Sequence, residues 1–125
     1  MKQIISTDQA PKASGVYSQA VHSNGLLFVA GQIHTTAEGV LVEGTIEQKL
    51  AQVMKNITAI LDAAEVTLDD IVKVTMYVTD ISELPELNKH YPGYFSDVLP
   101  AREAVCVKAL PLGASLEISV IASKN

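Results

Sequence analysis

Two apolar-rich segments near the start of the chain flank an Asn-Gly pair. Residues 16–23 and 26–31 carry β-branched and aromatic side chains, with Asn24-Gly25 between them. Asn-Gly favours a type I′ turn because both central positions of that turn need a positive φ. The pattern therefore predicts a β-hairpin. The weaker pattern that follows predicts a loop over 32–39, with 40–42 as a candidate short strand.

The apolar period becomes helical after Thr45. From this point apolar residues recur at steps of three and four, and charged residues fall on the other positions. Thr45 and Gln48 have the spacing of a capping box, in which each side chain binds the backbone N–H of the other residue. The pattern predicts an amphipathic helix that begins after Thr45. Its buried face is expected to comprise Ile46, Leu50, Val53, Ile57, Ile60, Leu61 and Ala64.

The second half of the chain returns to strand alternation and contains one helical segment. Residues 72–79 alternate like a half-buried strand, and 103–108 and 116–122 predict two further strands. A helix is predicted from Ser82, with Pro85 in its first turn, where proline is tolerated. Its expected buried residues are Leu84, Leu87, Tyr91 and Phe95, with a bend at Pro92-Gly93.

This order of elements predicts an α+β fold with one mixed sheet and both helices on one of its faces. The residues expected to face the helices are Val74, Met76, Val78, Val105 and Val107. The uncovered face would then carry Thr75, Tyr77, Ala104 and Cys106, in register with Arg102. Such a face is too apolar to suit water, so the pattern predicts a homo-oligomer with sites near the boundary between subunits.

Composition agrees with a covered surface and with one domain over 1–125. The 125 residues are 48% hydrophobic and only 18% charged, against about 25% charged in an average soluble domain. The net charge of −5 disfavours a nucleic-acid partner, and a single cysteine excludes an internal disulfide. The chain shows no apolar run of membrane-spanning length and no secretory signal, so no membrane partner is expected and the cytoplasm is the expected location.

Three residues are candidates for chemistry. Arg102, the single arginine of the chain, could bind a carboxylate bidentately, although an ordinary salt bridge is an equally open alternative. Glu117 has apolar neighbours that would raise its pKa and suit it to handle a proton or a water, unless strand alternation simply places it in solvent. Tyr17 could line a pocket or could only pack.

Cysteine and histidine give weaker evidence for a functional site in this chain. Cys106 has no histidine close in sequence and is better interpreted as a small hydrophobic residue than as a nucleophile. The three histidines, His22, His34 and His90, show no ligand-like spacing, so no metal site is expected.

Five short motifs occur along the chain. They are Gly-Val-Tyr-Ser-Gln-Ala at 15–20, Gly31-Gln32, Pro100-Ala101-Arg102, Leu110-Pro111 and Leu116-Glu117-Ile118. Together they make the chain similar, from end to end, to the RidA family, also called the YjgF family, of reactive-imine deaminases. The resemblance implies a two-layer chorismate-mutase-like fold, with a six-stranded mixed sheet and two helices on one face. It also implies a homotrimer whose sheets form a central barrel, with clefts between neighbouring subunits.

The resemblance further implies an activity. This is the hydrolysis of 2-imino acids, or of 2-aminoacrylate-type enamines, to 2-keto acids and ammonia, without a cofactor. Carried over by position, Arg102 would pair with the substrate carboxylate, Glu117 would hold or help activate the attacking water, and Tyr17 would line the cleft from a neighbouring chain. The resemblance assigns substrate contacts or the cleft rim to Gly31, Asn88, Ala104 and Pro111.

The chain departs from the family pattern at four positions. Ala30, His34, Glu103 and Ala104 stand where Ser, Pro, a small residue and Cys are common. Alternation should point Glu103 away from Arg102. The departures leave two functions open, namely imine hydrolysis and the binding of small carboxylates by a non-catalytic regulatory protein of the same fold. A ribonuclease activity, reported within the family, conflicts with the acidic charge.

Overall fold

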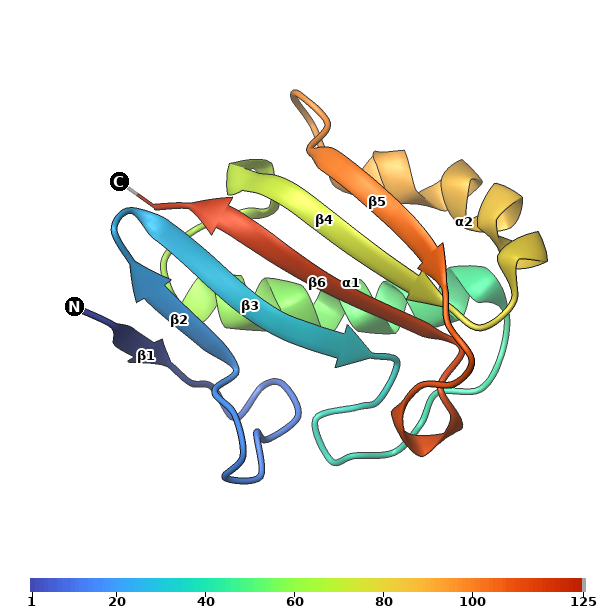
Figure 1. Ribbon diagram of the computed structural model, residues 1–125, viewed down its shortest axis with the longest axis horizontal. Coiled ribbons are helices and arrows are strands. Elements are labelled where there is room, and N and C mark those ends of the chain that lie inside the picture. The colour runs from blue at the N-terminus through green and yellow to red at the C-terminus, as the bar shows by residue number, and fades with distance from the viewer. Residues whose placement is uncertain (125) are drawn as a thin grey trace.

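The computed structural model describes residues 1–124, which form six strands and two α-helices (Figure 1). The strands are β1 (Gln3–Ile5), β2 (Ala20–Ser23), β3 (Leu26–Ile33), β4 (Ile71–Val78), β5 (Ala101–Cys106) and β6 (Leu116–Ser123). The helices are α1 (Ile46–Ala63) and α2 (Leu84–His90).

All six strands belong to one sheet, in the order β1-β2-β3-β6-β4-β5. β4 and β5 run parallel, and each of the other neighbouring pairs runs antiparallel. Both helices lie on the same side of the sheet, with α1 behind β3 and β6 and α2 beside β5 (Figure 1). The predicted α+β fold, with a mixed sheet and its helices on one face, is therefore confirmed. Within residues 1–124, no helix is long and apolar enough to cross a membrane.

The hairpin prediction is confirmed at its turn. β2 and β3 pair antiparallel around Asn24 and Gly25, whose φ values of 51° and 77° fit the type I′ turn. The first strand of the hairpin, β2, begins at Ala20 rather than at residue 16. Before it the chain turns, with φ of 42° at Ser14 and 84° at Gly15, and such a positive φ does not occur within a regular strand. Tyr17 therefore lies in a loop.

Two short segments differ from the prediction. β1 is an edge strand, paired with β2, that the sequence pattern did not reveal. Residues 40–42, a candidate strand, form only an isolated bridge between Leu41 and Thr35. Three residues are too few for alternation to be informative, which is why the pattern failed in both places.

The predicted helix α1 and its capping box are confirmed. The Thr45 hydroxyl accepts from the Gln48 N–H at 3.1 Å, and the Gln48 side chain accepts from the Thr45 N–H at 2.9 Å. At the other end, the Lys124 ammonium donates to the free carbonyl of Ala64. One face of the helix packs under the sheet. Its buried residues are Leu50, Val53, Met54, Asn56, Ile57, Ile60 and Leu61.

The second helical segment is broken into three pieces. A 3₁₀ turn over Ile81–Glu83 precedes α2, and a second one over Tyr91–Tyr94 follows it, so the bend predicted at Pro92-Gly93 occurs there. Pro85 lies in the first turn of α2. Of the four expected core residues, Leu87 and Tyr91 are buried, and Leu84 and Phe95 pack partly buried against the core.

β4 alternates as predicted. Val74, Met76 and Val78 are at most 1% exposed and face the helices. Tyr77, on the other face, is half-buried.

β5 has the opposite phase to the one predicted. The parallel pairing places Arg102 opposite Val74 and Ala104 opposite Met76, so the residues expected on the open face lie on the helix side, and Cys106 follows them there. Val105 pairs with Tyr77 and is 39% exposed on the open face, while Val107 lies beyond the end of the strand. The sequence pattern predicted the wrong phase because β5 carries apolar residues at consecutive positions. Its phase is therefore set by the register with β4 rather than by hydrophobicity.

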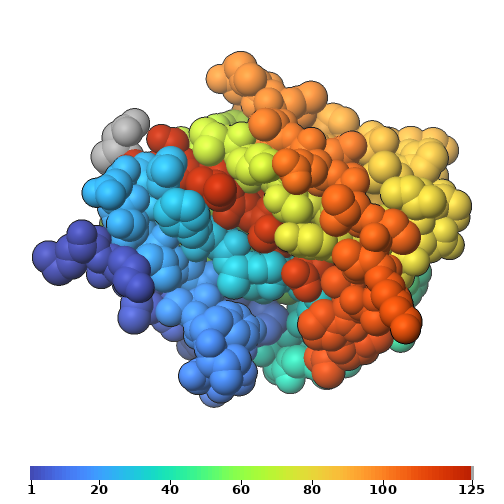
Figure 2. Space-filling view, viewed as in Figure 1, coloured from blue at the N-terminus to red at the C-terminus, as the bar shows by residue number. Residues whose placement is uncertain are grey.

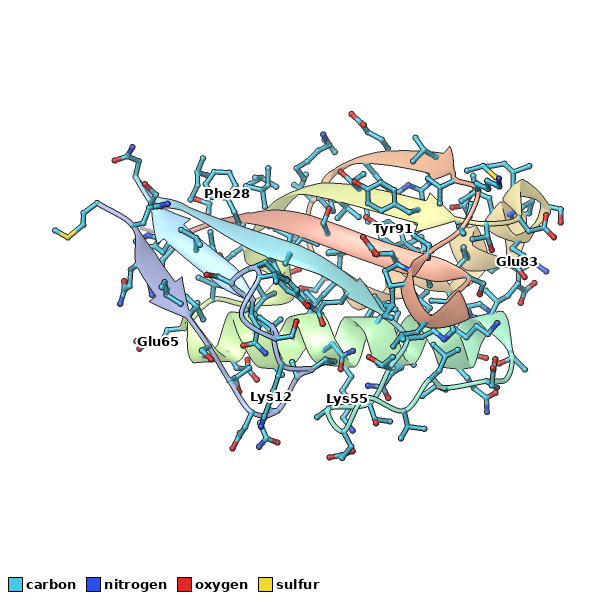
Figure 3. The ribbon with its side chains drawn as sticks, turned by 60° about the horizontal axis from the view of Figure 1, so that its bottom comes forward. Lys12, Phe28, Lys55, Glu65, Glu83 and Tyr91 are labelled. Carbon is cyan, nitrogen blue, oxygen red and sulfur yellow. The ribbon has the colours of Figure 1, made fainter. Side chains whose placement is uncertain are left out.

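The face of the sheet opposite the helices is uncovered in the single chain. Figure 2 shows this side, where the side chains of β3, β6, β4 and β5 form the surface. Phe28 projects from it, away from α1 (Figure 3), and is 45% exposed. Large apolar side chains on such a face favour contact with another protein surface.

We predict that the buried face of α1 contributes strongly to stability. Ile57 is fully buried, so Ile57→Ala should lower the free energy of unfolding by about 2–5 kcal/mol through lost burial and the cavity left behind. Urea unfolding followed by circular dichroism measures this loss. Ile81→Ala makes the same chemical change at a residue that is 52% exposed, and should cost less than about 1 kcal/mol. Equal losses would contradict the assigned core.

Candidate functional site

Arg102 is held by two residues of the helix layer. Its guanidinium lies over the ring of Tyr91, with 5.0 Å from the guanidinium carbon to the ring centroid, and its Nη1 donates to Asn88 Oδ1 at 2.8 Å. Asn88 belongs to α2, and Tyr91 follows directly after it. A cation over an aromatic face and a fixed acceptor together restrict the orientation of the long side chain.

The guanidinium has no carboxylate partner among residues 1–124. The nearest acid in sequence, Glu103, points to the other face of β5 and pairs there with Lys73 at 3.2 Å, as alternation predicted. Asn88 occupies one of the five N–H donors of Arg102, so the others remain for an anion. The site is a hollow of about 280 Å³. Its lining residues are Asn88, Tyr91, Pro92, Leu99, Pro100 and Arg102.

A second hollow, of about 650 Å³, is larger than the one at Arg102 and lies near Tyr17, Gly31 and Pro111. The loop that precedes β2, the end of β3, the loop after it and the turn before β6 form its walls. Its lining includes three predicted site residues, Tyr17, Gly31 and Pro111. Tyr17 is 51% exposed there, so its ring is available to a ligand or to a second chain.

Glu117 lies beside this second hollow. It is half-buried in β6, and a bulge in the pairing of β3 with β6 brings Gly31 against its carboxylate. A Cβ at position 31 would overlap the Glu117 carboxyl group, so the site needs glycine for close approach. Burial raises the pKa of the Glu117 carboxyl above its ordinary value of 4.5. Burial thus favours the protonated form of this carboxyl group more than water would, as its apolar neighbours in the sequence indicated.

A buried glutamine positions the loop that carries Tyr17. Gln19 is 3% exposed, and its side chain donates to the Pro11 carbonyl at 2.8 Å and accepts from the Thr7 N–H at 2.7 Å. The backbone carbonyl of Gln19 accepts a hydrogen bond from the Ala30 N–H at 2.9 Å. The Gln19 side chain thus replaces a regular strand pairing and fixes the loop against the sheet.

The single chain therefore brings the predicted residues together in two groups. Arg102 and Asn88 lie at the edge strand on the helix side of the sheet. Tyr17, Gly31, Pro111 and Glu117 lie around the second hollow, and the two hollows share no lining residue. Ala104 is on the same face as Arg102 but packs against the core instead of lining either hollow.

Two residues contribute to these hollows beyond the roles that the sequence predicted for them. Tyr91 was expected only as a core residue, yet its ring supports Arg102. Lys12 lines the second hollow and adds a positive charge to it. Neither residue could be assigned from local pattern, because each acts on groups that are distant in sequence. In the part of the chain that the structure describes, no group of three His, Cys, Asp or Glu residues is placed to bind a metal ion.

The protein is a two-layer α+β fold with an arginine at a sheet edge that has no carboxylate partner among residues 1–124, and with a half-buried carboxyl group beside a loop-walled hollow. Comparison with known proteins gives the family. The family model described as Endoribonuclease L-PSP matches residues 7–124. The chain belongs to this family, the RidA (YjgF) family.

Individual relatives are similar over nearly their full length. A RutC family protein of Aquifex aeolicus is 51% identical over 123 residues, which cover 96% of this chain and 98% of that protein. The 2-iminobutanoate/2-iminopropanoate deaminase of Rattus norvegicus is 41% identical over 123 residues, covering 98% and 90% of the two chains. The crystal structure of the yeast protein YEO7 superposes with a TM-score of 0.96 at 40% identity, and the match covers 100% of each chain.

We predict that the Tyr91 ring contributes to carboxylate binding through Arg102. Tyr91→Leu removes the aromatic face and should weaken the binding of pyruvate, used as a probe, by about 2- to 30-fold, the range that corresponds to a cation–π contact. Tyr91→Phe keeps the face and should bind nearly as the wild type does. Isothermal titration calorimetry gives both affinities. Tyr94→Leu, a matched change that does not touch Arg102, is the control, and equal affinities for Tyr91→Leu and the wild type would contradict the role.

Proposed function

We propose that this protein hydrolyses reactive 2-imino acids, or their 2-aminoacrylate-type enamine tautomers, to 2-keto acids and ammonia. The observation that carries the proposal is Arg102, a cation fixed by Asn88 and Tyr91 with donors left for a substrate carboxylate. The printed name of the rat relative, a 2-iminobutanoate/2-iminopropanoate deaminase, supports the same reaction.

The proposed chemistry needs orientation and one placed water. The carboxylate of the imino acid binds the Arg102 guanidinium, which directs the C=N carbon toward Glu117. Glu117 accepts a proton from the attacking water as its oxygen bonds to that carbon, and the proton then passes to the nitrogen. The hydroxyl proton of the resulting carbinolamine is then transferred to the same nitrogen, again through Glu117. The C–N bond breaks, ammonia leaves, and the carbon retains the oxygen as a ketone. The reaction consumes one water and no cofactor.

The proposal requires more than one copy of the chain. Arg102 and Glu117 lie on opposite faces of the sheet, because Arg102 pairs with the buried Val74 while Glu117 alternates with buried neighbours in β6. A homotrimer in which the open sheet faces form a central barrel would cover Phe28 and Val105, both exposed in the single chain. Such an assembly would also bring Arg102 of one copy to Glu117 and Tyr17 of the next.

The same geometry is compatible with a second function, a carboxylate sensor without turnover. The observation that favours it is the separation of the binding group, Arg102, from the proton-handling group, Glu117, within one chain. A nucleic-acid substrate is opposed by the net charge of −5. A cytoplasmic location remains a prediction.

Complementation between two inactive variants tests the shared site. We expect Arg102→Ala and Glu117→Ala each to abolish acceleration of imine loss, measured with a dehydratase and serine as the imine source. In a mixture of the two, unfolded and refolded together, about one quarter of the sites would pair two intact residues if three copies assemble at random.

Recovery of activity in the mixture would support the site between chains. Activity that persists in Arg102→Ala would refute the carboxylate role, and pyruvate binding by the wild type without any turnover would establish the sensor instead. Lys108→Ala, which removes an exposed charge just after β5, is the control and should behave as the wild type does.

The pH dependence of turnover tests the role of Glu117. The proton acceptor must be ionised, and burial raises its pKa above 4.5, so kcat should fall with decreasing pH from a midpoint above that value. Glu117→Gln should lower kcat by about 10²-fold or more and remove this acidic limb. Stopped-flow rates of imine loss between pH 5 and pH 8, with the rate in buffer subtracted, provide the measurement. An unchanged acidic limb in Glu117→Gln would exclude Glu117 as the titrating group.

A further inference from the structure

His34 is a buried histidine that the proposed reaction does not use. It is 1% exposed, and both ring nitrogens have backbone partners. Nδ1 lies 2.9 Å from the Val42 carbonyl oxygen, and Nε2 lies 3.0 Å from the Ser115 nitrogen. A carbonyl only accepts and an amide N–H only donates, so Nδ1 carries the hydrogen and Nε2 is the acceptor. The partners therefore specify a neutral ring in one tautomer.

The ring joins the two segments that wall the larger hollow. The first is the loop over 34–42, in which the Val42 N–H also donates to the His34 carbonyl at 2.7 Å. The second is the chain at the start of β6, 81 residues further on. The first segment contributes Thr35, Ala37, Glu38 and Gly39 to the lining, and the turn before Ser115 contributes Pro111 and Leu112. Glu117 follows Ser115 by two residues.

Each wall is also tied separately to α1. Asn56 donates to the Thr35 carbonyl at 2.8 Å, and the Lys49 ammonium donates to the Ser115 hydroxyl at 3.1 Å. The overall fold thus has other anchors, and the Ser115–His34 hydrogen bond links the two walls directly. Loss of the ring should change their separation more than it changes the stability of the sheet.

We propose that His34 is a positioning residue of the cleft, whose neutral imidazole holds the two walls at the separation that the substrate and Glu117 require. This inference rests on the proposed function for its substrate. It does not require turnover, because the geometry of the hollow also governs the binding of a keto acid.

Protonation of the ring would break this link. A hydrogen on Nε2 would face the Ser115 N–H, and two donors cannot share a hydrogen bond. Lys49 of α1 opposes a second positive charge nearby, whereas Glu43, in the segment after the first wall, favours it. Burial is the largest effect and lowers the pKa of His34 below 6.5.

The sign of the pH effect follows from this lowered pKa. The folded protein prefers the neutral ring, so the stabilisation by His34 is complete above pH 6.5, the pKa in the unfolded chain, and is lost as the pH falls through the lower folded value. The affinity of the folded hollow for a keto acid should fall around the lower folded pKa, where the ring gains its proton.

Pyruvate binding by calorimetry, measured from pH 7.5 to pH 5, tests the proposal together with the ¹⁵N resonances of the imidazole ring. In the wild type we expect the Nδ1–H tautomer at pH 7.5, a titration midpoint below 6.5 and an affinity that falls with the same midpoint. His34→Ala, which leaves the Ser115 N–H without its acceptor, should bind pyruvate roughly tenfold more weakly at pH 7.5. His34→Gln supplies an uncharged acceptor and should restore part of that affinity without the pH step.

The control is His90→Gln. His90 pairs with Glu86 and Glu47 in the helix layer, so this variant should keep the wild-type pH step. An Nε2–H tautomer, a ring midpoint at or above 6.5, or wild-type affinity in His34→Ala would each overturn the proposal. If His34→Ala does not fold, the ring resonances of the wild type and the pH profile of His34→Gln decide the question. Absence of imine turnover would refute the proposed function alone, because these measurements use only binding and spectroscopy.

Discussion

The arrangement of the candidate site depends on how β4 pairs with its two neighbours. On one side the parallel pairing sets Val74 opposite Arg102, and on the other the antiparallel pairing sets Tyr77 opposite Glu117. Because side chains alternate along a strand, these two registers send Arg102 to the helix side and Glu117 to the open side. A slip of one residue in either register would place the guanidinium and the carboxyl group on the same face.

The same alternation keeps Arg102 available. Glu103, its sequence neighbour, is turned to the opposite face and neutralised there by Lys73. On the helix side the guanidinium meets an aromatic ring and an amide instead of a carboxylate. A cation without a carboxylate partner among residues 1–124 retains its attraction for an external anion, and the contacts with Asn88 and Tyr91 reduce the conformational entropy lost when that anion binds.

Local interactions were predictable from the sequence, and long-range ones were not. The Asn24-Gly25 turn and the Thr45–Gln48 capping box each depend on residues a few positions apart, so their spacing identified them. Hydrophobicity did not identify the phase of β5, because only its register with β4 sets that phase. Arg102 and Glu117 were selected as candidates from residue type and family motifs, whereas the support of Arg102 by Tyr91 depends on packing between α2 and an edge strand. The loop conformation at Tyr17 follows from the positive φ values of Ser14 and Gly15, which the sequence pattern did not predict.

The contact between Gly31 and Glu117 has an evolutionary consequence. The volume that a side chain at position 31 would fill is already taken by the Glu117 carboxyl group. A side chain at 31 would displace that group, the end of a flexible side chain, from its present place without a clash against backbone. The two positions are therefore epistatic: the effect of a substitution at 31 depends on whether residue 117 carries the acid. Selection for glycine at 31 would act through the placement of the carboxyl group rather than through folding.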